Sequence, residues 1–416
     1  MSTFLIDRLA KKLFNCYDYV EIKLWVIKYV KNDKESKAKS SATKILILIC
    51  VGIFIIFTVA KYTTDEDFRH DIDTNWLKKQ VSESKLNTIE INSDYNPSVY
   101  AYDKYITVLS KNKLTEYTSD GKAFAELDVN ISVPLVATSE KYMVMAEKEG
   151  QKIYLISGSN ILWQNTVEGK ISQVNVNRNG YVSIVIKNTT HKSVVVYFDL
   201  SGKELFRVYL SSTYVTSTAI STNNSYLAIG EVDYSGTIIK SYVKIVSVEL
   251  AQTDPKQSIV YTYESENNEI ITGIDYKDKT SAICMFNSYI QKVTPNSNER
   301  VYDITNNDLF VDINLRDAIA IIDKQSSGLF SYEYEVAMKS TNSTSENLYI
   351  LNSDLPKSLL VSGNVMAINL GNEVQIINSN GWLLKNYTSS KQISNIVLGN
   401  SIAGIVYKNK IEIISL

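Results

Sequence analysis

Few residues in this 416-residue sequence have the types and spacing that catalysis or metal binding requires. The two histidines, His70 and His191, do not belong to a Cys/His pattern of the kind that binds zinc. The sequence contains neither a Gly-x-Ser-x-Gly elbow for a nucleophilic serine nor a glycine-rich phosphate loop. The acidic runs 65–67 and 71–73 could contact calcium, but the other ligands of a loop site are missing. We therefore predict a protein that is not an enzyme and holds no cofactor or metal ion.

Binding is the function that these exclusions leave, with hydrolysis by paired carboxylates as the alternative. A surface hydrolase acting on a glycan or peptide would need two carboxyl groups about 5–10 Å apart. The 45 Asp and Glu residues are too many for the sequence to single out such a pair. The net charge of −2 and the lack of a basic, aromatic-rich stripe in the C-terminal part argue against nucleic-acid binding.

The composition indicates that short strands and tight turns position the groups that carry the function. Tyr is abundant, with 28 residues against 11 Phe, and Pro is scarce, with 5. Tyr, Ile, Val and Thr pack well on a pleated surface, whereas Asn, Ser and Asp favour turns. We therefore expect an all-β fold over most of the chain.

From residue 85 onward, the sequence repeats one plan of four strands, of which the second is strongly apolar. Successive second strands begin 37, 39, 45, 54, 37, 48 and 36 residues apart. Periods near 40 with four strands each are typical of propeller blades, and we attribute the longer intervals to insertions such as 231–240 and 339–346. The eight second strands begin at Tyr105, Tyr142, Tyr181, Tyr226, Thr280, Asp317, Val365 and Ser401.

Turns and chain ends indicate a closed ring. Gly121, Gly202 and Gly381 each lie between a third and a fourth strand, where glycine accepts positive φ without steric cost. The eighth repeat ends without its fourth strand, and residues 86–92 form a strand that has no blade of its own. Pairing 86–92 with the last repeat closes an eight-bladed β-propeller and removes free sheet edges. Seven blades remain the alternative if the fourth and fifth repeats are divided wrongly.

We predict the partner-binding surface in the loops between second and third strands. The loops with the most polar and aromatic residues span 147–151, 187–192 and 231–240. The candidate contact residues in them are Lys148, His191, Asp233 and Tyr234. Tyr is enriched among the residues that dominate binding energy at interfaces. The expected partner is a protein or a component of the cell envelope.

Before the repeats, residues 45–60 form an uncharged apolar run. At 1.5 Å per residue it covers about 24 Å, slightly less than a hydrocarbon core of about 30 Å, and residues up to 62 can extend it. We predict a single transmembrane helix over 45–62 rather than a buried core helix or a cleaved signal peptide. Ten Lys and Arg residues precede the run, whereas Lys61 and the acidic run 65–67 follow it. Because positive charge stays on the inner side, we expect a cytoplasmic N-terminus and a propeller outside the plasma membrane.

These features divide the chain into four segments. Residues 1–44 are basic with apolar residues at helical spacing, so they can lie on an anionic membrane surface, bind a partner helix or remain a solvated tail. Residues 45–62 are the predicted membrane helix. Residues 63–84 are predicted to be a juxtamembrane helical linker, a short amphipathic helix whose apolar residues recur every four positions. Residues 85–416 are the predicted propeller.

The anchor, the repeat period and the Ser-Gly-Lys hairpins followed by an aromatic residue resemble a known group of proteins. They are similar to bacterial single-pass membrane proteins of unknown function, from Gram-positive anaerobes, with an extracytoplasmic WD40-like or quinoprotein-like propeller. The resemblance covers the anchor and all eight repeats, and it implies an architecture but no catalytic residue. Quinoprotein enzymes use repeated Trp docking motifs, whereas we interpret Trp163 and Trp382 as packing residues of fourth strands.

Overall fold

The computed structural model describes residues 37–65, 68, 72, 77, 79–81, 86–187, 190–326, 332–351 and 355–416. The chain divides into two compact units, Met1–Leu77 and Lys78–Leu416. Most of the predicted cytoplasmic segment, and most of the predicted linker at 63–84, lie outside the described residues.

In the first unit, helix α3 (Lys37–Thr64) contains the uncharged run at 45–60. Among the described helical residues, no stretch is both long enough and apolar enough to cross a bilayer. Large apolar side chains on this helix are exposed, namely Ile47, Leu48, Val51, Ile53, Ile55, Ile56, Phe57 and Val59.

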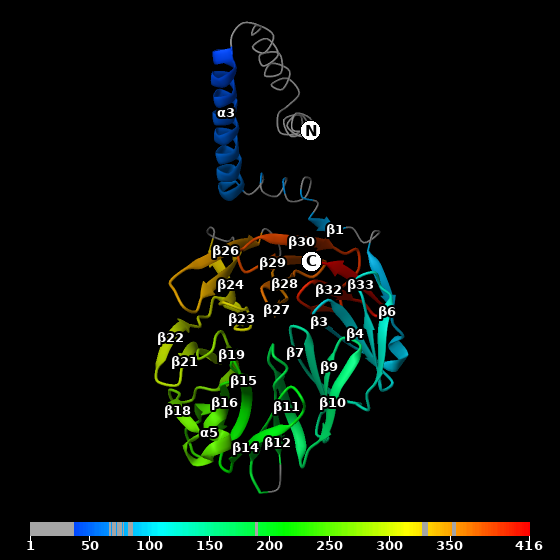
Figure 1. The fold of residues 1–416 in the computed structure, drawn as a ribbon, viewed down its shortest axis with the longest axis vertical. Helices are drawn as coiled ribbons and strands as arrows, with labels where there is room; N and C mark the ends of the chain where they lie inside the picture. Colours follow the sequence, from blue (N-terminus) through cyan, green and yellow to red (C-terminus); the bar gives the residue numbers. More distant parts are fainter. Residues whose placement is uncertain are drawn as a thin grey trace. The chain divides into compact units, whose positions relative to one another are not determined.

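The second unit consists of eight β-sheets, each an antiparallel meander of four consecutive strands except where the ring closes. Figure 1 shows the first strand of each blade near the centre and the fourth strand near the periphery. All eight predicted second strands are present and begin within two residues of the predicted positions. The eight-bladed propeller is therefore confirmed, and the seven-bladed alternative is wrong.

The strands of the first four blades follow the chain without a break. Blade 1 holds β3 (Ser98–Tyr102), β4 (Tyr105–Ser110), β5 (Lys113–Tyr117) and β6 (Ala123–Asp128), and blade 2 holds β7 (Pro134–Ser139), β8 (Tyr142–Glu147), β9 (Lys152–Ser157) and β10 (Asn160–Thr166). Blade 3 holds β11 (Lys170–Val176), β12 (Val182–Lys187), β13 (Ser193–Phe198) and β14 (Glu204–Leu210), and blade 4 holds β15 (Tyr214–Ile220), β16 (Tyr226–Asp233), β17 (Lys240–Ser247) and β18 (Ile259–Glu264).

The remaining blades repeat this order. Blade 5 holds β19 (Ile271–Tyr276), β20 (Ala282–Phe286), β21 (Tyr289–Val293) and β22 (Asn298–Asp303), and blade 6 holds β23 (Asp308–Asp312), β24 (Ala318–Ser326), β25 (Tyr332–Ser340) and β26 (Glu346–Leu351). Blade 7 holds β27 (Ser358–Ser362), β28 (Val365–Asn369), β29 (Glu373–Asn378) and β30 (Leu383–Thr388), and blade 8 holds β31 (Asn395–Leu398), β32 (Ile402–Val406) and β33 (Lys410–Ser415).

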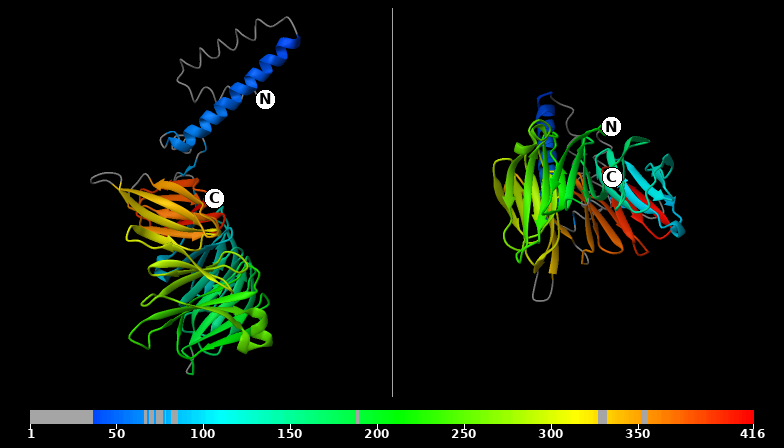
Figure 2. Two further views of the ribbon diagram at one scale, coloured as in Figure 1. Left: turned by 90° about the vertical axis from the view of Figure 1, so that its left-hand side faces the viewer. Right: turned by 90° about the horizontal axis from the view of Figure 1, so that it is seen from below.

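The ring closes as the sequence predicts. Strand β2 (Asn87–Glu90) pairs antiparallel with β33 and supplies the missing fourth strand of blade 8. The red C-terminal strands therefore lie beside the cyan strands at the start of the propeller (Figure 2). A short helix η3 (Ser93–Tyr95) leads from β2 into blade 1. The sequence did not predict β1 (Gln80–Val81), which pairs parallel with β30 and makes blade 7 five-stranded.

The turns between third and fourth strands in blades 3 and 7 share one hydrogen-bonded form. In blade 3, the Asp199 carboxylate accepts hydrogen bonds from the backbone nitrogens of Ser201 and Lys203, and the Gly202 nitrogen donates to the Asp199 carbonyl. In blade 7, the Asn378 Oδ1 accepts the equivalent hydrogen bonds from the backbone nitrogens of Asn380 and Trp382. Gly202 has φ +83°, a conformation that a side chain would disfavour.

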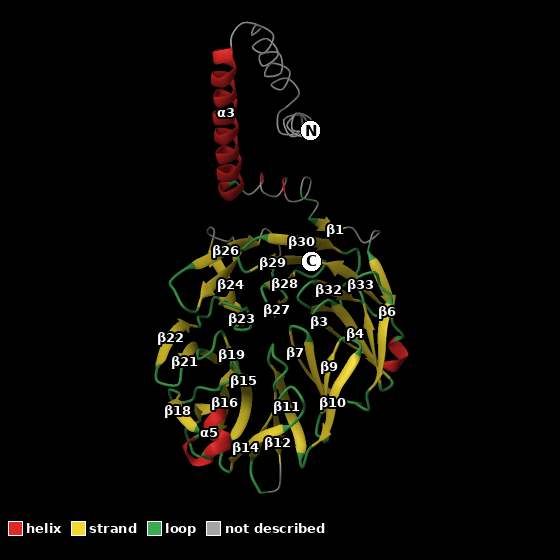
Figure 3. Cartoon of the chain, viewed as in Figure 1, coloured by secondary structure: helices red, strands yellow, loops and turns green. Residues whose placement is uncertain are grey.

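Blade 4 is long for a reason that the sequence did not reveal. Helix α5 (Val248–Thr253) and the 3₁₀ helix η4 (Pro255–Gln257) lie between its third and fourth strands (Figure 3). The predicted insertion at 231–240 is shorter, because β16 continues to Asp233 and β17 begins at Lys240. In blade 6, the extra length comes mainly from the long hairpin of β24 and β25.

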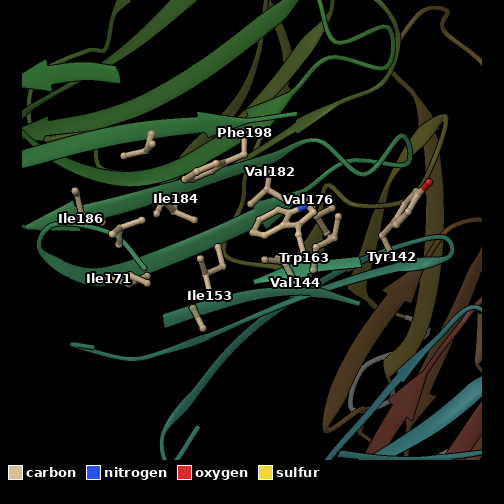
Figure 4. Close-up of a cluster of buried hydrophobic side chains, with 14 of the residues drawn as sticks. Tyr142, Val144, Ile153, Trp163, Ile171, Val176, Val182, Ile184, Ile186 and Phe198 are labelled. Atoms are coloured by element: carbon tan, nitrogen blue, oxygen red, sulfur yellow. The ribbon is translucent and has the colours of Figure 1, made fainter. Parts of the chain in front are cut away.

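The core consists of apolar clusters between neighbouring blades. Between blades 2 and 3, the Trp163 and Phe198 rings lie 5.7 Å apart among aliphatic side chains of both sheets (Figure 4). Burial of this kind contributes about 1.5–3 kcal/mol for each large side chain. Trp163 is therefore a packing residue as predicted, whereas the same interpretation of Trp382 is wrong because that side chain is 63% exposed.

Candidate functional site

The meander of each blade divides its connections between two ends of the ring. Connections from first to second and from third to fourth strands lie at one end, which we call the hollow face. Connections from second to third strands, and from each blade to the next, lie at the other end, which we call the patch face. This division follows from the antiparallel strand order alone.

The four predicted contact residues all lie on the patch face of three consecutive blades. Lys148 lies in the β8–β9 connection of blade 2, and His191 in the β12–β13 connection of blade 3. Asp233 ends β16 in blade 4, and Tyr234 follows it. The structure brings His191, Asp233 and Tyr234 together around Lys192, whereas Lys148 lies one blade away from them.

Two stacked tyrosines and a lysine form the centre of this group. The Tyr214 and Tyr234 rings stack with centroids 4.9 Å apart at an angle of 14°. The Lys192 Nζ lies 4.9 Å from the Tyr214 centroid and 5.6 Å from the Tyr234 centroid. The same Nζ donates a hydrogen bond to the Ser212 carbonyl at 2.9 Å. A cation over an aromatic face contributes about 0.5–1 kcal/mol at an exposed site, so the three side chains hold one another in place.

A second aromatic pair extends the group toward blade 3. The His191 and Tyr209 rings lie 5.0 Å apart, and the His191 Nδ1 lies 2.9 Å from the Ser211 Oγ. We refer to His191, Lys192, Tyr209, Tyr214, Asp233 and Tyr234 as the tyrosine patch. Tyr209 and Tyr234 are 55% and 54% exposed, so both rings present apolar surface to solvent.

Asp233 is fixed at the edge of the tyrosine patch. Its carboxylate accepts hydrogen bonds from the Ser235 Oγ at 2.7 Å and the Ser235 nitrogen at 2.9 Å. These bonds, and the nearby positive charge of Lys192, hold the pKa of Asp233 below its usual range. The side chain is therefore an ionised acceptor at neutral pH.

Sequence reasoning missed half of the tyrosine patch. Lys192 ends a predicted loop but was not singled out, and Tyr209 and Tyr214 flank the connection between blades 3 and 4. Two tyrosines within six residues around an inter-blade connection are a usable signal, but only the register between β15 and β16 of blade 4 shows that Tyr214 meets Tyr234.

The hollow face contains a central cavity of about 310 Å³, which the turns of all eight blades line. Its volume lies near the lower limit of typical ligand pockets, about 300–1,000 Å³. Most lining side chains are polar, and six are charged, namely Asp103, Glu140, Arg178, Asp275, Lys277 and Arg316.

One of these charges is structural. The Lys277 side chain is 1% exposed, and its Nζ lies 2.7 Å from the Asp275 Oδ2. The same Nζ donates to the Leu315 carbonyl at 2.6 Å and to the Ile313 carbonyl. Because an ammonium group has three N–H donors, these contacts use all of them and join blade 5 to blade 6.

Another pair spans the cavity. The Arg316 Nη2 lies 3.1 Å from the Glu140 Oε1. Arg316 belongs to blade 6 and Glu140 to blade 2, and blades four positions apart in a ring of eight face each other. The Arg316 nitrogen donates to the Gly363 carbonyl at 2.9 Å, which fixes the base of the arginine on blade 7.

A hydrolase of the alternative kind would need two neighbouring carboxyl groups in this cavity. Glu140 and Asp275 are each paired with a cation, and Asp103 is the third acid of the lining. No group of three or more His, Cys, Asp or Glu residues that could hold a metal ion occurs among the described residues.

Residues 77–416 match a family described as a family of unknown function, DUF5711. The chain belongs to this family. That membership agrees with the resemblance to propeller proteins of unknown function, whereas the single-pass anchor and the bacterial source stay predictions. No curated protein matches the DUF5711 chain in sequence.

Solved structures similar to this DUF5711 protein share its fold at low identity. BamB from Moraxella catarrhalis is 10% identical, with a TM-score of 0.44 over 80% of this chain and 99% of that chain. The Kuenenia stuttgartiensis hydrazine synthase is 10% identical, with a TM-score of 0.41 over 81% and 99%. The Neurospora crassa Pan2 WD40 domain is 10% identical, with a TM-score of 0.44 over 74% and 95%.

Proposed function

We propose that this protein is a membrane-anchored, non-catalytic binding module that captures an acidic protein segment at its tyrosine patch. The observation that carries the proposal is the exposed stack of Tyr214 and Tyr234 with Lys192 over both rings. Tyrosine supplies a large amphipathic contact area with few rotatable bonds, and it is enriched among dominant interface residues.

The patch is ordered before a partner arrives. Stacking fixes Tyr234, and the Ser212 carbonyl fixes Lys192. Binding then costs little side-chain entropy, which otherwise amounts to about 0.5–1.5 kcal/mol for each immobilised side chain. An exposed but fixed aromatic surface is what an interface centre requires.

The charges around the patch favour an acidic partner. Lys187 pairs with Glu149 at 2.9 Å, and Glu147 and Glu168 offset Lys148 and Lys170 on the same face of blades 2 and 3. The preference for an acidic partner therefore rests on Lys192, at the centre of the patch. The Lys192 ammonium offers one hydrogen bond to a backbone carbonyl and keeps further donors for a carboxylate. A segment with Asp or Glu beside an aromatic or aliphatic residue complements this surface.

Membrane anchoring through residues 45–62 is the second part of the proposal. It rests on the uncharged run within α3 and on the ten Lys and Arg residues that precede it. We expect the propeller on the outer side of the plasma membrane, where its partner is a protein of the cell envelope.

Photo-crosslinking in intact cells tests the partner site. A photoreactive amino acid in place of Tyr234 should capture a discrete protein, because that side chain lies at the patch centre. The matched control is the same substitution at Phe124, an aromatic residue that is 49% exposed on the hollow face. Equal capture from both positions would contradict the proposal, as would a captured glycan in place of a protein. Replacing Lys192 or Tyr214 with Ala should abolish the Tyr234 adduct.

Cell fractionation tests the anchor separately. The full chain should sediment with membranes and resist extraction by high salt, and externally added protease should remove the propeller from intact cells. A variant lacking residues 45–62 should become soluble. Recovery of the full chain in the soluble fraction would contradict the anchor without affecting the patch.

A further inference from the structure

The central cavity of the hollow face has cationic donors that the protein leaves open. A guanidinium group carries five N–H donors. Among the described residues, the Arg316 side chain forms one polar contact, in which Nη2 donates to the Glu140 Oε1. Arg178 lines the same cavity from blade 3, is exposed, and forms no ion pair with any described residue. Two guanidinium groups therefore face the cavity with most of their donors unused.

Arg316 is held in position by groups that do not consume its side-chain donors. Its backbone nitrogen donates to the Gly363 carbonyl at 2.9 Å. Gly363 has φ +59°, and a Cβ on it would lie 3.1 Å from the Asn400 Oδ1 and 3.8 Å from the Arg316 Nη2. The missing side chain thus leaves space beside the guanidinium, where an amide of Asn400 also faces.

The ion pair with Glu140 already shows that the Arg316 guanidinium can bind a carboxylate in this cavity. The Glu140 carboxylate reaches it from the opposite blade, and the two side chains are 41% and 42% exposed. An ion pair this accessible contributes about 0–1 kcal/mol, so a ligand can displace it at small cost. The pair of the buried Lys277 and the half-buried Asp275 differs, because Lys277 is part of the wall and its donors are saturated.

We propose that the central cavity binds a small polar ligand through a carboxylate group, and that Glu140 occupies the carboxylate position in the free protein. Arg316 and Arg178 are the groups that bind the carboxylate. Asn175, Asn314 and Asn400 offer neutral hydrogen-bonding groups around it, and Asp103 offers an acceptor for a hydroxyl or ammonium group of the ligand. The volume of about 310 Å³ equals that of about ten waters at about 30 Å³ each, which suits a ligand no larger than a short peptide or a sugar acid.

The cavity is fixed before a ligand binds. On this face, the Thr222 nitrogen donates to the Asp278 carbonyl, and the Ser401 nitrogen donates to the Asp103 carbonyl, so turns of different blades are bonded to each other. The site lies on the face opposite the tyrosine patch. It could therefore hold its ligand while the patch holds a partner.

Calorimetric titration of the purified full chain tests this site with two probes that differ in one group. N-acetylglycylglycine carries a carboxylate, whereas its C-terminal amide does not. We expect the acid to bind and the amide to bind at least about ten-fold more weakly, because a charged hydrogen bond is worth about 1.5–3 kcal/mol. Arg178→Gln and Arg316→Gln should each weaken binding of the acid by a similar factor.

The Glu140→Gln variant gives the decisive result. Removing the competing carboxylate should strengthen binding of the acid about three-fold to ten-fold, an effect that loss of folding cannot produce. Arg207→Gln is the matched control, because Arg207 forms an ion pair with Glu204 on the outer strand of blade 3, away from the cavity, and should leave binding unchanged. The proposal would be overturned if the acid and the amide bound equally, or if inorganic phosphate bound more tightly than the acid. It would also be overturned if neither the natural chain nor Glu140→Gln bound the acid.

Discussion

Buried hydrogen bonds join neighbouring blades at both ends of the ring, for example from Lys277 to blade 6 on the hollow face and from the Val215 nitrogen to the Ser193 Oγ on the patch face. The two ends differ because the patch face of blades 3 and 4 adds a layer of exposed side-chain contacts outside these bonds. Lys277 and Arg316 illustrate the first arrangement, since each reaches a backbone group of the next blade. Lys192 and Tyr234 illustrate the second, since the Lys192 ammonium group lies over the Tyr234 ring at the surface. The difference teaches that buried polar groups secure the fold, whereas the exposed side chains of the patch face can change at little cost in stability.

The largest expected effect is the loss of the buried lysine on the hollow face. Lys277→Met leaves Asp275 and two carbonyl groups without their donor, and should lower the free energy of unfolding by about 3 kcal/mol. Denaturant titration of the purified chain measures this. Lys113→Met is the control, because Lys113 forms a pair with Glu126 in which both side chains are 53% exposed, and should change stability by less than about 0.5 kcal/mol. Equal losses would remove the distinction between the two faces.

The next effect depends on pH and concerns a buried carboxyl group near the hollow face. Glu116 is fully buried; its Oε1 accepts a hydrogen bond from Tyr102, and its Oε2 has no partner among the described residues. Burial raises the pKa of Glu116 to about 7. The folded state thus favours the protonated form, and the associated stability is present below the usual pKa of about 4.5 and lost as the pH rises through 7.

Glu116→Gln should remove this dependence. At pH 8 the variant should be more stable than the natural chain, by an amount on the order of 2 kcal/mol, and the difference should vanish below about pH 4. Unfolding curves at the two pH values measure it. Glu231 is the contrasting residue, because this buried carboxylate near the patch face pairs with Lys244 and accepts from the Thr213 Oγ1 at 2.5 Å. Glu231→Gln should destabilise the protein, and a gain in stability there would be inconsistent with our account.

A smaller effect is expected at turn glycines. A Cβ at Gly202, on the hollow face, would lie 2.7 Å from the Trp163 Cγ, and the residue has φ +83°. Gly202→Ala should therefore cost about 1–2 kcal/mol. A Cβ at Gly236, in a patch-face loop, would meet nothing closer than 3.8 Å, so Gly236→Ala should be neutral within about 0.5 kcal/mol. Thermal unfolding of both variants compares them, and a larger loss at Gly236 would reverse our assignment of the two faces.

The smallest effect on stability should come from the tyrosine patch itself. Tyr234→Ala together with Asp233→Ala should change the free energy of unfolding by less than about 1 kcal/mol, because Tyr234 is exposed and Asp233 is only half-buried. The same double variant should lose partner capture in cells. Retained capture by a folded variant would show that the partner binds elsewhere.

Several features of this fold could be predicted because they repeat. The apolar second strands recur near every 40 residues, and the unpaired segment at 86–92 could be assigned to blade 8, because a ring must pair every edge. Other features left no periodic signal. Strand β1 has two residues, and helix α5 has six, so neither is long enough to show a pattern. Trp382 was misassigned because a residue next to a turn glycine can point to either side of the blade.

The sequence by itself determined the four-strand repeat, the way the ring closes and the loops in which His191, Asp233 and Tyr234 lie, whereas the structure decided between eight blades and seven. These follow from local strand and turn preferences and from the pairing of sheet edges. Only the tertiary structure decided that Tyr234 stacks on Tyr214 and that Glu140 reaches Arg316, residues 20 and 176 positions apart. The first contact depends on the register between β15 and β16, which places Tyr214 opposite Val232 and next to the loop of Tyr234. The second depends on the width of the ring, which arises from packing between sheets and leaves no mark on the residues themselves.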